Sequence, residues 1–176
     1  MNKNINKANR LVIGLIAGLL FLSSVVAFAN NGGSFSLATA RPQINVTLSG
    51  MIERDKEKLQ LDKVEAVKPG EILHWTINSE NKGDGEAKEY KAVGKIPAGT
   101  VFVAKSAKAE GAAAITYSID GGKTFSAQPM IEEKQADGSV KLVPAPESMY
   151  SQVRFEWEAP LNPNEKLNAF YDVKVK

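Results

Sequence analysis

The stretch Gln152-Val153-Arg154-Phe155-Glu156-Trp157-Glu158 has the most regular alternation of apolar and polar side chains in the chain. Successive side chains of a β-strand point to opposite faces, so a period of two predicts a strand with one buried face and one solvated face. We therefore expect Val153, Phe155 and Trp157 to point into a core, while the charged side chains between them face water.

The same period of two recurs on both sides of this stretch. After residue 41, no segment carries a 3.6-residue apolar stripe over three turns, and the alanine-rich residues 104–114 contain Gly111 and are expected to form a loop. We count about eight or nine short strands, with turn signals roughly every 8–15 residues. The expected apolar rows are Ile44, Val46 and Leu48; Leu59 and Leu61; Leu73, Trp75 and Ile77; Ile115, Tyr117 and Ile119; Val140 and Leu142; and Tyr171, Val173 and Val175.

This pattern predicts an all-β fold, an antiparallel β-sandwich over residues 42–176. One apolar face per strand means that two sheets pack face to face. Trp75 and Trp157 are the expected core anchors, because a tryptophan buries more apolar surface than any other side chain. Asp120-Gly121-Gly122-Lys123 supplies positive-φ residues for a tight hairpin that leads into Thr124-Phe125-Ser126.

Residues 1–29 have the three parts of a bacterial export signal. Three basic residues precede the apolar residues 11–22, and Ala27-Phe28-Ala29 fits the small-residue cleavage motif. We expect a signal helix that is cleaved between Ala29 and Asn30. The alternative is a retained anchor, because residues 11–29 are long enough to cross a bilayer, but no basic stop signal follows them.

Cleavage would leave a flexible leader over residues 30–41, which begins Asn-Asn-Gly-Gly-Ser and has no periodicity. The expected location is extracytoplasmic, either periplasmic or secreted, after Sec-type export. Contact with a membrane is expected only through the signal peptide before cleavage.

The charge of the chain is close to neutral once the signal is removed. The full chain has 22 Lys and Arg against 20 Asp and Glu, and three of the basic residues lie in the signal, which leaves −1. That balance offers no positive field for nucleic acid. There are no cysteines, so disulfides, thiol chemistry, a lipidated N-terminal Cys and Cys-ligated metals are excluded. An apolar core alone must hold the domain.

The residue types that carry catalysis are sparse. His74 is the single histidine and is expected on the solvated face, whereas triads and zinc sites need a histidine with partners. Glu156 and Glu158 share a strand face in the predicted pattern, which would place their carboxylates about 7 Å apart, within the range that glycosidases use. Arg154 on the same face offers a charge partner. The chain also has no excess of exposed aromatic residues that would indicate a sugar-binding surface. The solvated-face interpretation is favoured, and no catalytic residue is predicted.

Four acidic residues fall in expected loops, where oxygen ligands for Ca²⁺ could gather. The loop over residues 81–86 lacks the dense acidic spacing of a calcium loop, and turn chemistry accounts equally well for Asp beside Gly. We therefore predict neither a metal site nor a cofactor. The four residues are Asp84, Glu86, Asp120 and Asp137.

Three motifs follow one another in order after residue 66. The segment Val67-Lys68-Pro69-Gly70-Glu71-Ile72-Leu73-His74-Trp75-Thr76-Ile77 combines a Pro-Gly turn with an aromatic-centred strand. It is followed by Asn81-Lys82-Gly83-Asp84-Gly85 and by Lys95-Ile96-Pro97-Ala98-Gly99-Thr100-Val101-Phe102-Val103. In this order they resemble the conserved-repeat family known as domain of unknown function eleven.

The likeness covers residues 44–176, because residues 115–125 and Pro144-Ala145-Pro146-Glu147 also resemble secreted members with a single repeat. Gly94-Lys95 departs from the family pattern, where many members have an acidic residue. The resemblance implies an immunoglobulin-like sandwich of the kind found on bacterial and archaeal surface proteins, and it transfers no catalytic residue.

Three functions of different classes are considered. The first is a non-enzymatic secreted or cell-envelope module, structural or binding, with an unknown ligand and with envelope proteins, surface proteins or further copies of itself as partners. The second is a fibre or matrix subunit that donates the strand at residues 43–49 to a neighbour's sheet, although pairing within its own domain is the simpler arrangement. The third, a hydrolase using Glu156 and Glu158, is not favoured.

Overall fold

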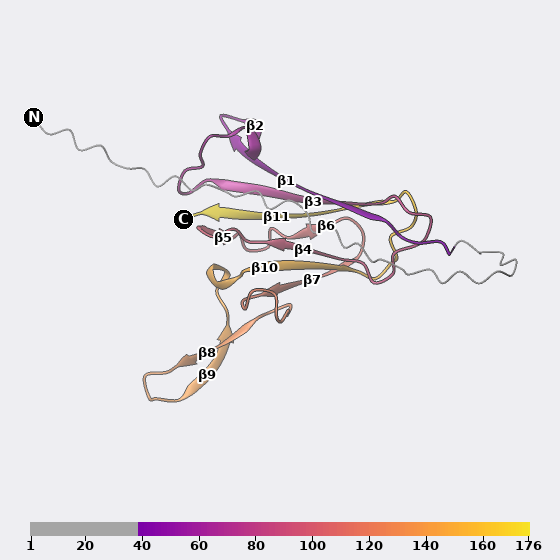
Figure 1. Ribbon diagram of the computed structural model, residues 1–176. Coiled ribbons are helices and arrows are strands. Elements are labelled where there is room, and N and C mark those ends of the chain that lie inside the picture. Colours follow the sequence, from indigo (N-terminus) through magenta and orange to yellow (C-terminus); the bar gives the residue numbers. More distant parts are fainter. Residues whose placement is uncertain (1–38) are drawn as a thin grey trace, which may run out of the picture.

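The computed structural model describes residues 39–176, so the expected signal helix, the cleavage position between Ala29 and Asn30 and most of the leader lie outside it. The described part is an all-β fold of antiparallel sheets (Figure 1). Its two helices are single 3₁₀ turns, η1 (Leu61–Lys63) and η2 (Glu147–Met149). Neither has the length or apolar character needed to cross a membrane.

The larger sheet has the strand order β2-β1-β3-β11-β5, with the short strand β6 also paired to β11. β1 pairs with β3 from Ile44 opposite Asn81 to Ile52 opposite Leu73, and β11 lies on the other side of β3. The strands are β1 (Ile44–Arg54), β2 (Glu57–Gln60), β3 (Ile72–Asn81), β5 (Thr100–Phe102), β6 (Lys108–Ala109) and β11 (Lys166–Val175).

The smaller sheet has three strands, β4 (Lys91–Lys95), β10 (Gln152–Trp157) and β7 (Ala113–Ser118), with β10 in the centre. A separate two-stranded hairpin is formed by β8 (Met130–Lys134) and β9 (Val140–Pro144). In Figure 1 this hairpin projects beyond β7 and β10, on the side of the molecule opposite β1 and β2.

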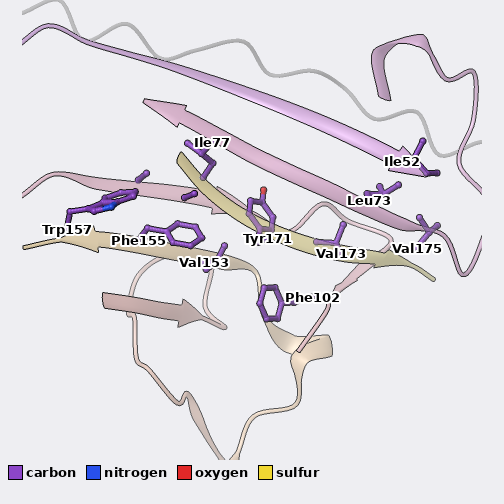
Figure 2. Close-up of a cluster of buried hydrophobic side chains, with 12 residues drawn as sticks. Ile52, Leu73, Ile77, Phe102, Val153, Phe155, Trp157, Tyr171, Val173 and Val175 are labelled. Atoms are coloured by element: carbon purple, nitrogen blue, oxygen red, sulfur yellow. The ribbon is translucent and has the colours of Figure 1, made fainter. Parts of the chain in front are cut away.

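The core lies between the larger sheet and the smaller, three-stranded sheet. Val153, Phe155 and Trp157 on β10 are buried, which confirms the strand and the inward row predicted from residues 152–158. Figure 2 shows these side chains facing Tyr171 and Val173 of β11. Because directly opposed residues of paired strands point to the same face, the register of β1, β3 and β11 aligns the other contributors, Ile52, Leu73 and Ile77.

The two tryptophans differ in how deeply they lie. Trp157 is 3% exposed, stacks on Tyr90 with 5.6 Å between ring centroids, and donates a hydrogen bond from Nε1 to the Glu110 carbonyl at 2.7 Å. Trp75 is half-buried and packs against the core from its border, where a Cβ added to Gly50 would lie 2.9 Å from its ring. Trp157 therefore anchors the core, and Trp75 closes one side of it.

Two local expectations differ from the structure. Gly121 and Gly122 have positive φ as predicted, but the tight hairpin does not form, because only an isolated bridge joins Tyr117 to Ser126. The pattern also did not predict β8, and Val140 and Leu142 are 61% and 62% exposed rather than inward-facing. They lie on the projecting hairpin, which no sheet covers.

Candidate functional site

The first half of β1 is uncovered. Val46 and Leu48 are 53% and 55% exposed, although they lie on the same face of the strand as the buried Ile52. The expectation that both side chains would be buried is therefore wrong. The reason is that the smaller sheet has too few strands to extend over β1, and Leu61 of η1 covers this strand only near Gly50.

Among residues 39–176, the outer edge of β1 also has no strand partner over this half. β2 pairs with β1 only from Met51 to Arg54, so residues 44–50 have no strand neighbour on that side within the described residues. Their sequence, Ile-Asn-Val-Thr-Leu-Ser-Gly, contains no charge and no proline. Proteins usually protect sheet edges with charged residues, proline or bulges, and the edge strand β4 carries Lys91 and Lys95. The β1 edge is able to accept a further strand.

The β8–β9 hairpin is a second uncovered surface. Val140 and Leu142 share one face of β9, and Met130 of β8 lies on the same face opposite Pro144. None of the ten residues in β8 and β9 belongs to the hydrophobic core or to the side chains packed against it. An isolated two-stranded hairpin is only marginally stable in water, so this arm has the properties of a docking element.

A polar clamp holds the chain where it enters β1. The buried Asn81 accepts hydrogen bonds at Oδ1 from the amides of Gln43 (3.1 Å) and Gly83 (3.0 Å). Its Nδ2 donates to the carbonyls of Gly85 (2.7 Å) and Leu161 (2.9 Å). We refer to these contacts as the Asn81 clamp. These four hydrogen bonds join three backbone segments, at residue 43, at residues 83–85 and at residue 161.

Further contacts hold the chain just before β1, and β1 itself has the simpler of its two expected arrangements, pairing within its own domain. Arg41, placed in the flexible leader, is held by its amide hydrogen bond to Asp84 Oδ1 at 2.7 Å, and its carbonyl accepts from the Gly85 amide at 3.2 Å. Residues 44–49 are paired with β3 of their own domain. The strand at residues 43–49 is thus not in a donated position in this structure.

His74 lies on the outer face of the larger sheet, as expected. Its Nδ1 is 2.8 Å from Asp172 Oδ1, and its side chain is 48% exposed. Asp172 is its directly opposed partner on β11, so the two form a cross-strand pair on a solvated face. A hollow beside them is lined by Lys58, Lys105 and other side chains of mixed charge.

Glu156 and Glu158 differ in structure and environment. β10 ends at Trp157, so Glu158 lies beyond the strand and the expected shared strand face does not form, although both residues line one surface hollow. Glu156 pairs with Lys91 Nζ at 2.7 Å and Arg154 Nη2 at 3.5 Å. The hydrogen bond from Lys91 lowers the pKa of Glu156, with the charges of Lys91 and Arg154 acting in the same direction. A general acid requires the opposite shift.

The four acidic loop residues mainly serve their own turns. Asp120 accepts hydrogen bonds from Thr124 Oγ1 at 2.6 Å and Ser118 Oγ at 2.7 Å, and these contacts lower its pKa strongly, the bonds from Thr124 most of all. Asp137 accepts from Ser139. Within residues 39–176, no three His, Asp or Glu side chains gather as a metal-binding group. Asp84 and Glu86 bond to Arg41 and Lys88, respectively.

Comparison with known proteins found no matching family model, no matching curated protein and no matching solved structure. The residue pattern and the two uncovered surfaces are therefore the features that bear on function. One signal for the hairpin was present in the sequence, because Asp137-Gly138 is a dipeptide typical of hairpin turns. The exposure of β1 had no such signal.

Proposed function

We propose that this chain is a non-enzymatic, exported structural or binding module with an immunoglobulin-like sandwich of the conserved-repeat family named above. The observation that carries the proposal is the order of the parts. The export-signal pattern of residues 1–29 precedes an all-β domain whose first strand begins at Ile44. A chain without cysteine that crosses a membrane unfolded must be stabilised by its core alone, and the buried sheet-on-sheet core is suited to this.

The polar side chains support a non-enzymatic role. His74 faces solvent beside Asp172, and Glu156 is held ionised by Lys91. Asp120 is occupied by hydrogen bonds within its own turn. His74, Glu156 and Asp120 thus each have a structural partner that accounts for their position.

Fractionation and intact mass test this proposal. The full chain is expressed in a bacterial host, and the expected product has the mass of residues 30–176 in the extracytoplasmic fraction. A matched variant, Ala27→Lys with Ala29→Lys, removes the small-residue cleavage motif and should accumulate as the uncleaved chain. Wild-type protein that keeps residues 1–29 and remains in the cytoplasm would contradict the proposal.

A second candidate function is a fibre or matrix subunit that assembles by strand addition. The uncharged, unpaired edge of β1 over residues 44–50 favours it. Negative-stain microscopy of purified protein after long incubation at high concentration tests it. Fibres or ordered chains are expected, whereas a uniform monomer under these conditions would reject this candidate and leave the exported-module proposal intact.

A further inference from the structure

The two uncovered apolar surfaces lie on opposite sides of one molecule. β1 lies toward one margin of the larger sheet, and the β8–β9 hairpin extends beyond the opposite side (Figure 1). The hairpin therefore has no access to β1 of its own chain in this fold. Any contact between the two surfaces must join two different copies.

The two surfaces match in chemistry. The outward face of β9 presents Val140, Leu142 and Pro144 without a charge, whereas the same face of β8 also carries Glu132 and Lys134. β9 is therefore the strand suited to the uncharged edge of β1. Antiparallel pairing that sets Leu142 opposite Val46 also sets Val140 opposite Leu48. Directly opposed apolar side chains are the pairs that stabilise antiparallel sheets.

The two surfaces also match in length. In this register the five residues of β9 lie against residues 44–48, and the hairpin turn at Gly138 falls opposite Gly50. β2 begins to occupy the edge at the next residue, Met51. The hairpin thus ends where the free edge ends, without a steric conflict with β2.

We propose that the β8–β9 hairpin of one copy adds to the free β1 edge of the next, with β9 as the new neighbour of β1. This inference rests on the second candidate function and names the donating element. Because each copy keeps one hairpin and one edge available, the contact is head-to-tail and adds further copies, either as an open chain or as a closed ring.

The main competing arrangement joins two β1 edges around a two-fold axis. Antiparallel pairing centred on Thr47 would place Gln43 of each copy opposite Met51 of the other, where Gln60 of β2 is already paired. Residues 41–43 do not bend away easily, because the Asn81 clamp holds Gln43, and Asp84 and Gly85 hold Arg41. Steric conflict with β2 therefore disfavours this arrangement.

Charge insertion tests the proposal in the full mature chain. Leu48→Lys on β1 and Leu142→Lys on β9 should each raise the concentration needed for assembly about tenfold or more, as measured by sedimentation velocity. Val93→Lys is the matched control, because Val93 is also an exposed apolar strand residue but lies on neither surface. All three variants should unfold at the wild-type temperature. Equal assembly of Leu142→Lys and wild type, or no assembly of the wild type at any concentration, would overturn the proposal.

Single cysteines separate the two arrangements, because the chain has none of its own. In the proposed register Thr47 lies opposite Lys141, so Thr47→Cys mixed with Lys141→Cys should form a disulfide-linked dimer under mild oxidation. Either variant alone should yield less disulfide-linked dimer, by a factor of about ten or more. A homodimer of Thr47→Cys that forms as readily as the mixed species would establish the two-fold arrangement instead. None of these results depends on export, which intact mass and fractionation test separately.

Discussion

The strand β10 and the first half of β1 share the same sequence pattern and have opposite environments. Both alternate apolar and polar residues, but Phe155 on β10 is buried while Leu48 on β1 is exposed. β10 is the central strand of its sheet and faces β11 across the core, whereas β1 has no strand of the smaller sheet above its first half. Alternation shows which residues share a face, and only the second sheet decides whether that face is buried.

The largest expected effect comes from shortening a buried side chain of β10, the strand whose apolar face is covered. Phe155→Ala should lower the free energy of unfolding by about 3–5 kcal/mol, because it removes a fully buried ring and leaves a cavity. Urea titration followed by tryptophan fluorescence measures the change. A loss below about 1 kcal/mol would mean that the buried side chains of β10 contribute little to the stability of the core.

Removing the Asn81 clamp should have the next largest effect on stability, because the uncovered half of β1 is held by polar contacts. Asn81→Ala should cost about 2–3 kcal/mol by leaving buried backbone groups unpaired, and amide exchange at Gln43 should become faster. Asn78→Ala is the control, since Asn78 bonds to Asn168 on the outer face. Unchanged exchange at Gln43 would contradict the role assigned to the clamp.

A glycine tests how closely the smaller sheet packs on the larger one. A Cβ at Gly94 would lie 2.4 Å from the Tyr171 ring, whose hydroxyl donates to the Lys95 carbonyl at 2.9 Å. Gly94→Ala should therefore destabilise the protein by about 1–3 kcal/mol, as thermal unfolding would detect.

A smaller, pH-dependent effect is expected at the covered end of β1. Arg54 Nε donates to Glu71 Oε1 at 2.8 Å, and this hydrogen bond lowers the pKa of Glu71 below its ordinary value of 4.5. A lowered pKa contributes stability above pH 4.5 that is lost as the pH falls further. Melting temperatures between pH 7 and pH 3 should decline less steeply in Glu71→Gln than in wild type. Parallel curves of melting temperature against pH for the two proteins would show that the Arg54–Glu71 pair adds nothing to stability.

The smallest effect on stability is expected from the exposed apolar side chains in the first half of β1. Leu48→Ala should change the free energy of unfolding by no more than about 0.5 kcal/mol, whereas Ile52→Ala, on the same face of the same strand, should cost about 2–4 kcal/mol. Paired urea titrations compare them. Equal losses at the two positions would show that Leu48 is buried in solution, which assembly itself would cause at high concentration.

The strands that the sequence predicted best are those whose burial follows from local pattern and central position. Residues 152–157 and 72–77 are two such segments, because period-two alternation is a local property of the chain. Coverage of β1 was not predictable, since it depends on the number of strands in a different sheet. The family pattern likewise offered no reason for Gly94, which the Tyr171 ring now explains.

The candidate surfaces depend even more on distant parts of the chain. Asn81 was recognised only as part of a turn, but its contacts reach residues 38 and 80 positions away in the sequence. The β8–β9 hairpin was half predicted through Val140 and Leu142, although its position outside the sandwich was not. Its lack of a covering sheet is a property of the whole fold.

The Asn81 clamp also bears on when the domain is able to fold. It joins segments near residues 43, 83 and 161, and β3 pairs with both the first strand and the last. A polypeptide that emerges from a translocation channel with its N-terminus first would have β1, β2 and β3 outside long before β11 follows. The core and the clamp would then be completed only by the final residues, so the channel would release an open chain that closes after passage.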